Sequence, residues 1–446
     1  MTFTIDQIVR AMGAALVRGE GAYFLGSGIS AGSDLPDWLG VMKDIAAPLG
    51  LALTKDDDLA HIAQYCINAD HGNRGPLIGR LKRALSPHVQ HPNPYHTAIS
   101  RTNVTTIWTT NFDTLVEGAL ATTRLAVRAN DADLTGGTRD FDVELLKIHG
   151  CVDRSKADEL VLTQEDYENF ATSRPALCER LRHDLLHSSF LFIGYSYRDP
   201  NIATVLVEAR RLAAGATREH FFITKRETDP DAAQRQELWH SDLRRFGMRT
   251  TFMTDYDELN GALNRLALAS RGKSVFITGS HSAKSSLAAE IGTLLALTPG
   301  IVLLDGQSSG IGRDAASAFG TACVQQRTDI RDRIRFFPNP YSFDPTFSNN
   351  ASLLGTLKQW RANLARAAHT FVVFDGGMGT DAEIEVAREM DCVIVPVMGA
   401  KGGTADRLLS DRDIVRRLDP TYVANAQAGK ATARDVVKCL LETLPQ

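Results

Sequence analysis

The chain has 446 residues, of which 43% are hydrophobic and 23% charged, so it is long enough for two or three globular domains. Its formal net charge of −4 and its dispersed Lys and Arg residues provide no basic field, which excludes nucleic acid as the expected partner. Charges interrupt the apolar positions of the first 21 residues at helical spacing and no apolar run of 18 residues follows, so we expect an amphipathic helix, no membrane partner and a cytoplasmic location.

Residues 1–270 alternate between strand-like and helix-like stretches. Four apolar stretches run into a polar or glycine-bearing loop, as buried strands do: AYFLGSG, TTIWTTNFD, ELLKIHG and SFLFIGYSYRD. Helical patterns lie between them, such as LIGRLKRALSPH and ALCERLRHDLLHS. The alternation predicts an α/β fold with a mostly parallel sheet and helices on both faces, which binds ligands at the carboxyl ends of its strands.

The first of these loops, GSGISAGSDLPDW, is rich in glycine and serine. Gly26, Gly28 and Ala31 have the spacing G-x-G-x-x-G/A of dinucleotide-binding loops, and Ser27 and Ser30 add hydroxyl donors. Glycine-rich turns between a strand and a helix also occur for packing reasons. This loop by itself therefore leaves a nucleotide site and a packing role equally open.

The loops that end the four strands contain the motifs GSGISAGSDLPDW, TTNFD, KIHG and GYSYRDP. In order and approximate spacing they resemble the sirtuin family, over most of residues 10–225. The resemblance implies that NAD is bound by Gly26, Ser27, Gly28, Ser30, Asp37, Asp113, Gly194 and Ser196. It also implies a reactive centre in which Asn111 lines the nicotinamide pocket and His149 acts as the base.

The chemistry of NAD cleavage agrees with these two residue types. Breaking the bond between nicotinamide and ribose develops oxocarbenium character, which requires a group that orients water and a base whose pKa is near neutral. An asparagine and a histidine can supply these groups. The structural alternative is that His149 only caps a strand and Asn111 only forms a turn.

The chain also departs from the sirtuin deacylases. They usually have an arginine after the PDF element, where this chain has Leu39, and a four-cysteine zinc module after the histidine loop, where this chain has Cys151 alone. Its six cysteines form no C-x-x-C pair, so we expect no metal. Without a platform for acyl-lysine, water becomes the acceptor and NAD the substrate of a hydrolase. A protein deacylase, and a sensor that binds NAD or ADP-ribose without turnover, stay open as alternatives.

The strand pattern restarts near residue 270, which predicts two domains, residues 1–270 and 271–446, each with a Rossmann-like fold. Five strand candidates follow: SVFITGS, GIVLLDGQSSGIG, RIRFFPNP, TFVVFDGGMGT and DCVIVPVMG. The fourth ends in a glycine loop from which a helix opens at Thr380, so that backbone amides face a phosphate. Thr380 and Glu383 also fit a capping box, T-x-x-E.

This second region resembles the SLOG family of nucleotide sensors, and the order of the two domains resembles the effectors of the Thoeris anti-phage system. The resemblance implies a homotetramer built through the sirtuin-like domains. It also implies that a cyclic ADP-ribose isomer, made by a partner TIR-domain protein, binds residues 271–446 and activates NAD cleavage. The predicted activator-binding residues are Gly279, Ser280, Arg361, Gly376, Gly377, Gly379, Thr380 and Glu383.

Arg361 is the residue we match to the family's ligand-binding arginine, because its planar fork suits a phosphate. The alternative for Arg361 is a solvated helix face. A further alternative places the chemistry in the second domain, as a phosphoribohydrolase of the related plant-hormone-activating type. That family usually has a proline before its double glycine, where this chain has Asp375.

Overall fold

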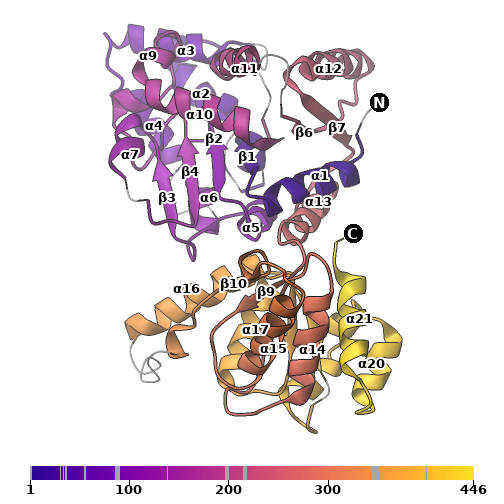
Figure 1. Ribbon diagram of the computed structural model, residues 1–446. Helices are drawn as coiled ribbons and strands as arrows, with labels where there is room; N and C mark the ends of the chain where they lie inside the picture. Colours follow the sequence, from indigo (N-terminus) through magenta and orange to yellow (C-terminus); the bar gives the residue numbers. More distant parts are fainter. Residues whose placement is uncertain are drawn as a thin grey trace. The chain divides into compact units, whose positions relative to one another are not determined.

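The computed structural model describes residues 3–30, 32–33, 35, 38–54, 57–85, 91–137, 139–195, 200–213, 218–342, 351–397 and 399–445. The chain divides into two compact units, Met1–Ser270 and Arg271–Gln446 (Figure 1). Each unit contains one parallel sheet with helices around it, so the predicted α/β class with two Rossmann-like sheets is confirmed.

Seven parallel strands form the sheet of unit 1, in the order β3-β4-β2-β1-β5-β6-β7. Their bounds are β1 Gly21–Leu25, β2 Thr106–Thr109, β3 Leu125–Arg128, β4 Val143–Lys147, β5 Ser189–Ile193, β6 His220–Lys225 and β7 Met248–Met253. Strands β1, β4 and β5 are buried along their whole length, as expected for a parallel sheet covered on both faces. Strand β1 pairs with β2 on one side and β5 on the other, so the strand order reverses there. In open α/β sheets ligands bind at this reversal.

Helices cover both faces of this sheet. One face carries α1 (Ile5–Val17), α5 (Pro94–Ser100), α6 (Leu115–Ala119) and α13 (Tyr256–Ala269), and Figure 1 shows α1 beside α13. The other carries α10 (Pro175–His187), α11 (Pro200–Leu212) and α12 (Pro230–Leu243). The predicted amphipathic helix near the N-terminus is α1, which opens in a capping box of Thr4 and Gln7.

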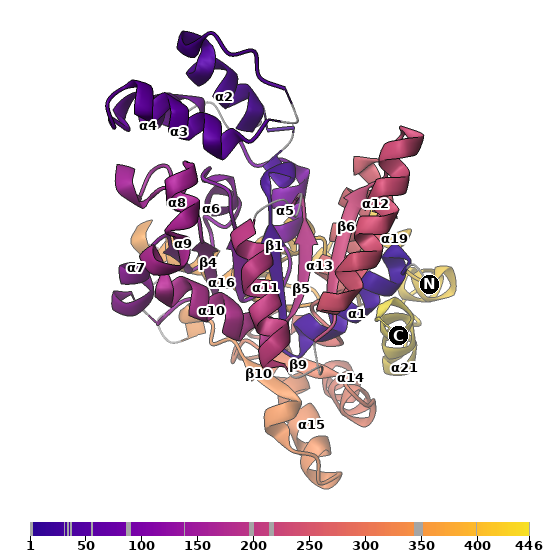
Figure 2. The ribbon, with the colours of Figure 1, turned by 90° about the horizontal axis from the view of Figure 1, so that it is seen from above.

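Three helices form a cap with an apolar cluster of its own. They are α2 (Trp38–Ala46), α3 (Leu59–Ala69) and α4 (Gly75–Ala84), and Figure 2 shows them grouped at one end of unit 1. Their cluster includes Val152, Leu160 and Leu162 from the segment after β4. That segment contains the short helices η3 (Ala157–Glu159), α8 (Gln164–Glu168) and α9 (Phe170–Ser173).

Unit 2 contains a five-stranded parallel sheet in the order β10-β9-β8-β11-β12. The strands are β8 Ser274–Thr278, β9 Val302–Asp305, β10 Ile334–Phe336, β11 Thr370–Val373 and β12 Val393–Pro396, and all five were predicted. The helices are α14 Ser286–Leu297, α15 Ile311–Gln325, α16 Ala351–Ala367, α17 Met378–Glu389, α18 Thr404–Leu409, α19 Arg412–Val415, α20 Pro420–Gln427 and α21 Ala433–Thr443. Within the described ranges, no helix combines the length and the apolar character needed to cross a bilayer.

Candidate active site

The glycine loop after β1 packs directly on the loop after β5. The amide of Gly26 donates to the carbonyl of Ile193 (2.9 Å), and the amide of Gly28 donates to that of Gly194 (2.8 Å). A Cβ atom on Gly26 would lie 2.4 Å from the carbonyl oxygen of Gly194, so only glycine allows this approach. The packing role that the sequence left open is thus present, and it uses the amides of Gly26 and Gly28.

Asn111 joins this loop to the loop after β2. Its side chain is 6% exposed, and its Nδ2 donates to the carbonyl of Gly26 and to Oγ of Ser30, both at 3.2 Å. Ser30 Oγ in turn donates to Oδ2 of Asp113 (3.0 Å). Because a carbonyl oxygen can only accept, the contact with Gly26 fixes which end of the amide is nitrogen. Four predicted residues, Gly26, Ser30, Asn111 and Asp113, therefore form one hydrogen-bonded group.

The other polar atom of the Asn111 side chain is its carbonyl oxygen, Oδ1. Asn111 Oδ1 is buried and accepts no hydrogen bond from any residue that the structure describes. An unsatisfied buried acceptor costs about 1–3 kcal/mol, so its presence requires an explanation. A hydroxyl or water that donates to Oδ1 removes this cost.

His149 lies in the next loop, which follows β4. It sits in a turn closed by the amide of Gly150 donating to the carbonyl of Lys147 (2.9 Å), and Gly150 has the positive φ of +94° that glycine adopts easily. The imidazole is 4% exposed. The rings of Phe112, Tyr167 and Phe170 surround it, with centroids 6.3, 5.6 and 5.8 Å away. His149 and Asn111 are thus on the loops that follow two paired strands, and the ring of Phe112, the residue after Asn111, lies near the imidazole.

Of four further residues predicted to bind NAD, the structure describes two. Ser27 is exposed at the start of the 3₁₀ turn η1 (Ser27–Ser30), and Gly28 is half-buried. Asp37 and Ser196 lie outside the described residues.

Two residues near this group were missed by the sequence reasoning. Asn93, the N-cap of α5, donates from Nδ2 to the carbonyl of Ile29 (2.9 Å) and so supports η1. His96 Nδ1 lies 2.9 Å from Asn93 Oδ1, and burial lowers the pKa of His96 to about 4 against the opposing charge of Asp113. The dipeptide Asn93-Pro94 is a helix-start signal that could have identified Asn93 as a cap, though not its contact with η1.

The segment between Cys151 and Phe170 contains short helices, and its apolar residues pack on the cap. Arg74 from the cap binds Asp166 through both terminal nitrogens (2.8 and 2.9 Å) and also donates to the carbonyl of Leu160 (2.9 Å). Nowhere in the described part of the chain do three or more His, Cys, Asp or Glu residues form a group able to hold a metal. Apolar packing and the ion pair between Arg74 and Asp166 thus hold this segment against the cap.

In unit 2, the glycine loop after β11 meets the end of β8. Thr278 Oγ1 donates to Glu383 Oε2 (2.5 Å), and burial raises the pKa of Glu383 against the opposing effects of Thr278 and Arg361. Arg361 is half-buried, and its Nε atom makes no hydrogen bond with the described residues. Of the predicted activator-binding residues, Arg361 and Glu383 are therefore close neighbours.

The predicted capping box of Thr380 and Glu383 is wrong. Helix α17 begins at Met378 with Gly377 as its N-cap, so Thr380 lies inside the first turn. Thr380 packs on Gly376, where a Cβ would lie 2.1 Å from Thr380 Oγ1. The side chain of Glu383 does not bond to the start of α17. Its buried carboxyl group accepts a hydrogen bond from Thr278 of β8 instead.

The remaining glycines of this loop differ from Gly376. A Cβ on Gly377 or Gly379 meets no atom within 4 Å, and neither residue has a positive φ, so open space surrounds both. Gly279 lies against Phe374, whose Cβ would be 2.8 Å from a Cβ on Gly279. The amide of Ser280 donates to the carbonyl of Asp375 (2.9 Å). Gly279 and Ser280 thus bring the two loops together, while Gly377 and Gly379 leave room for a ligand.

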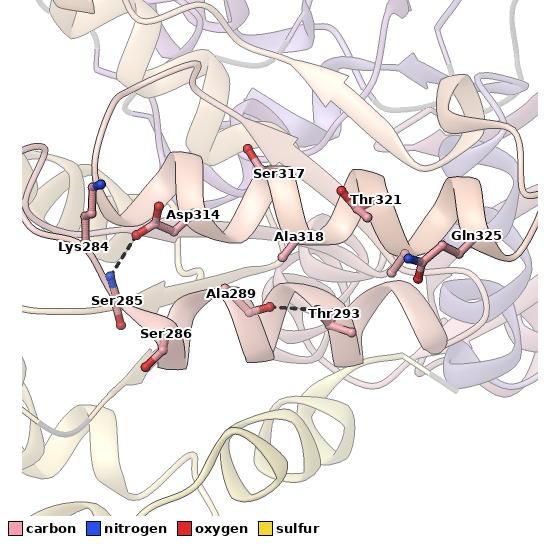
Figure 3. A pocket seen from close by; sticks show the side chains of 11 residues that line it. Lys284, Ser285, Ser286, Ala289, Thr293, Asp314, Ser317, Ala318, Thr321 and Gln325 are labelled. Carbon is pink, nitrogen blue, oxygen red and sulfur yellow. Dashed lines mark hydrogen bonds between the residues drawn. The ribbon is translucent and has the colours of Figure 1, made fainter.

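A hollow of about 600 Å³ lies elsewhere on unit 2, along α14 and α15 (Figure 3). Two of its polar side chains are used locally: Asp314 accepts from the amide of Ser285 (2.8 Å), and Thr293 donates to the carbonyl of Ala289 (3.0 Å). None of the predicted site residues lines it.

The chain is similar in sequence to known proteins. Residues 105–244, which contain the second, third and fourth motifs, match a family model described as a SIR2-like domain. "NAD(+) hydrolase ThsA" of Bacillus cereus (strain MSX-D12) is 30% identical over 287 residues, which cover 62% of this chain and 60% of that protein. A protein of the same name from Acinetobacter baumannii (strain 532279) is 26% identical over 455 residues, 94% of this chain and 91% of that protein. "Defense-associated sirtuin 2" of Bacillus subtilis is 28% identical over 230 residues, 49% of this chain and 22% of that protein.

The extent of these matches differs. The chain spans 60% of the length of the Bacillus cereus relative and 91% of the Acinetobacter baumannii relative, so the second match includes both units. The chain is therefore similar, over most of its length, to proteins named NAD(+) hydrolase ThsA, and residues 105–244 match a SIR2-like domain.

Proposed function

We propose that residues 1–270 hydrolyse NAD to ADP-ribose and nicotinamide. The observation that carries the proposal is Asn111, whose amide nitrogen is bound by Gly26 and Ser30 while its buried Oδ1 accepts no hydrogen bond from the described residues. The name NAD(+) hydrolase, which both ThsA relatives described above carry, supports the same activity.

Each residue has a distinct role in the proposed reaction. The bond between ribose C1′ and the nicotinamide nitrogen breaks, and its electron pair leaves with nicotinamide. Water then forms the new bond to C1′ and releases one proton. Asn111 Oδ1 accepts a hydrogen bond from the water or from a ribose hydroxyl, since Oδ1 is the free end of a fixed amide. His149 takes the proton as general base, in a setting enclosed by three aromatic rings.

The experiment measures nicotinamide release from NAD by the purified full chain and its variants. Asn111→Ala and His149→Ala should each reduce the rate by about 10²- to 10⁴-fold, the usual cost of removing one positioned acid-base group. His187→Ala, at an exposed histidine of α10, is the control and should leave the rate unchanged. Binding of NAD by the wild type without any nicotinamide release, both with and without the cyclic nucleotide, would favour the sensor alternative.

The proposal extends to regulation and cellular role. A cyclic ADP-ribose isomer from a TIR-domain partner binds residues 271–446 and activates NAD cleavage within a homotetramer, which depletes NAD during phage defence. The neighbouring Arg361 and Glu383, together with the open space at Gly377 and Gly379, support a nucleotide site there. The activator can shift a resting state only through its higher affinity for the active arrangement.

The test of this regulation compares cleavage with and without cyclic ADP-ribose. Arg361→Glu should abolish the response to the nucleotide, because it removes the group expected to bind a phosphate. Arg331→Glu is the control, since Arg331 is exposed on a turn of the same unit and pairs with Asp329 alone among described carboxylates. A normal response of Arg361→Glu would remove this residue from the proposed site. Native mass spectrometry tests the homotetramer.

A further inference from the structure

Lys147, the last residue of β4, is a lysine buried in the interior. Its side chain is 1% exposed, although lysine is almost never fully buried unless it is paired. Its Nζ atom donates to Oε1 of Glu117 in α6 (2.9 Å) and to the backbone carbonyl of Asp113. Lys147 therefore links β4 to two places in the segment that follows β2.

The charge on this lysine is maintained. Burial disfavours the ammonium, but the charges of Glu117 and Asp113 outweigh burial and hold the pKa of Lys147 above its ordinary value. Lys147 thus remains a three-donor cation at any physiological pH. Neutralising the charge of Glu117 requires only the bond from Lys147 to the Glu117 carboxylate. The second bond, to the neutral backbone carbonyl of Asp113, is not needed for that purpose.

The position of Lys147 relates it to both proposed catalytic residues. It stands two residues before His149, and its acceptor Asp113 stands two residues after Asn111. Strands β2 and β4 are paired, and the amide of Ile148 continues the ladder by donating to the carbonyl of Thr109 (3.0 Å). Beyond Thr109 the chain has no regular structure until α6. Lys147 holds the far end of that irregular stretch.

A displacement of Asp113 would reach Asn111 through side chains. The carboxylate of Asp113 accepts from Ser30 Oγ (3.0 Å), and Ser30 Oγ accepts from Asn111 Nδ2 (3.2 Å). The bond from Lys147 to the Asp113 carbonyl therefore supports the same group of residues that orients the Asn111 amide.

We propose that Lys147 is a positioning residue that holds the Asn111 loop at a fixed distance from His149. The inference rests on the proposed NAD hydrolysis, because a positioning effect is visible only if the two residues act on one substrate. The competing explanation is that Lys147 only neutralises the buried carboxylate of Glu117.

Three variants separate these explanations: Lys147→Met, Glu117→Gln and the double variant Lys147→Met/Glu117→Gln. Each is assayed for kcat and KM of nicotinamide release and for its melting temperature. Lys147→Met should lower the melting temperature, since it leaves the half-buried carboxylate of Glu117 without its cation. Glu117→Gln keeps the lysine bond to Asp113, so kcat should stay near that of the wild type.

The double variant decides the question. It removes both charges, so its melting temperature should return toward that of the wild type. Its kcat should stay about 10- to 100-fold low with KM changed less than about threefold, as expected when catalytic groups are misplaced by a fraction of an ångström to 1 Å. The matched control is Arg128→Met/Glu144→Gln, which removes another buried ion pair (3.0 Å) of the same sheet and should leave kcat unchanged.

A double variant with wild-type kcat overturns the positioning role and assigns Lys147 to charge neutralisation. A control pair that loses as much kcat as the double variant overturns it too, because any buried pair of the sheet would then have the same effect. Failure of the proposed function looks different: the wild type itself releases no nicotinamide, and this inference falls with it.

Discussion

Replacing Asn111 by aspartate changes one nitrogen for oxygen and leaves the side-chain shape unchanged. The consequence follows from the two bonds that this nitrogen donates, to the Gly26 carbonyl and to Ser30 Oγ. A carboxylate cannot donate either of these hydrogen bonds. It also places a buried oxygen against the carbonyl oxygen of Gly26. Only the hydroxyl of Ser30, which donates to the carboxylate of Asp113, would separate the introduced carboxylate from that of Asp113.

The magnitude can be estimated from these contacts. Asn111→Ala loses the same two bonds, while the Gly26 carbonyl keeps its bond from the amide of Ile29 (3.1 Å). At about 0.5–1.5 kcal/mol for each lost bond, the variant should lose about 1–3 kcal/mol of unfolding free energy. Asn111→Asp adds an uncompensated buried charge, and its cost should be about 3–5 kcal/mol at neutral pH. The isosteric variant is therefore expected to be less stable than the truncated one.

The stability difference between Asn111→Asp and the wild type should depend on pH. Burial and the neighbouring carboxylate should raise the folded-state pKa of the introduced acid above its unfolded value of about 3.9. The folded variant then binds more protons than the unfolded chain, so its stability relative to the wild type rises as the pH falls from neutral toward that raised pKa.

Urea unfolding followed by tryptophan fluorescence, at about pH 8 and pH 5, measures both effects. Three of the four tryptophans, including buried Trp108, belong to unit 1. An aspartate variant as stable as the alanine variant at the higher pH would refute the reasoning. So would a difference that grows on acidification.

Further predictions address the glycine loop, a buried histidine and the absence of metal. Gly26→Ala should unfold unit 1 or displace the loop, because its Cβ would meet the backbone of Gly194 at 2.4 Å, whereas Gly136→Ala meets no atom within 4 Å and should be silent in thermal unfolding. Burial lowers the pKa of His220 to about 4, and its Nδ1 accepts from the amide of Phe190, so the folded chain binds fewer protons than the unfolded one below about pH 6.5. Stability should therefore fall between about pH 6.5 and pH 4, less steeply in His220→Gln, and an equal slope in both chains would contradict this. Chelation with EDTA should leave nicotinamide release and the melting temperature unchanged, and about one zinc per chain by metal analysis would contradict the expectation.

The strands that carry the motifs could be predicted because each is a buried apolar run ending in a polar loop. Strands β3, β6 and β7 were missed. Strands β3 and β7 form the edges of the sheet. The four residues of β3 alternate between half-buried and buried, and the six residues of β7 mix buried, half-buried and exposed positions. Such short alternations do not stand out from the surrounding sequence. Strand β6 opens with a buried histidine, which no apolar pattern predicts.

For the site, the order of four motifs brought Asn111 and His149 into neighbouring loops of the same sheet. The steric reason for the glycine at Gly26 could not be predicted, since its partner Gly194 is far away in the sequence and the approach depends on the paired strands. Lys147 was missed for the same reason, because its partners in space, Asp113 and Glu117, lie 34 and 30 residues away. The capping box was misplaced because the sequence does not show that Glu383 binds Thr278.

The most direct test of the account is the amount of nicotinamide that the purified full chain releases from NAD, with and without added cyclic ADP-ribose, in the wild type and in Asn111→Ala. The account predicts release by the wild type, stimulated by the nucleotide, and a loss of about 10²- to 10⁴-fold in the variant under both conditions. Release by Asn111→Ala at the wild-type rate, or no release by the wild type under either condition, would contradict it.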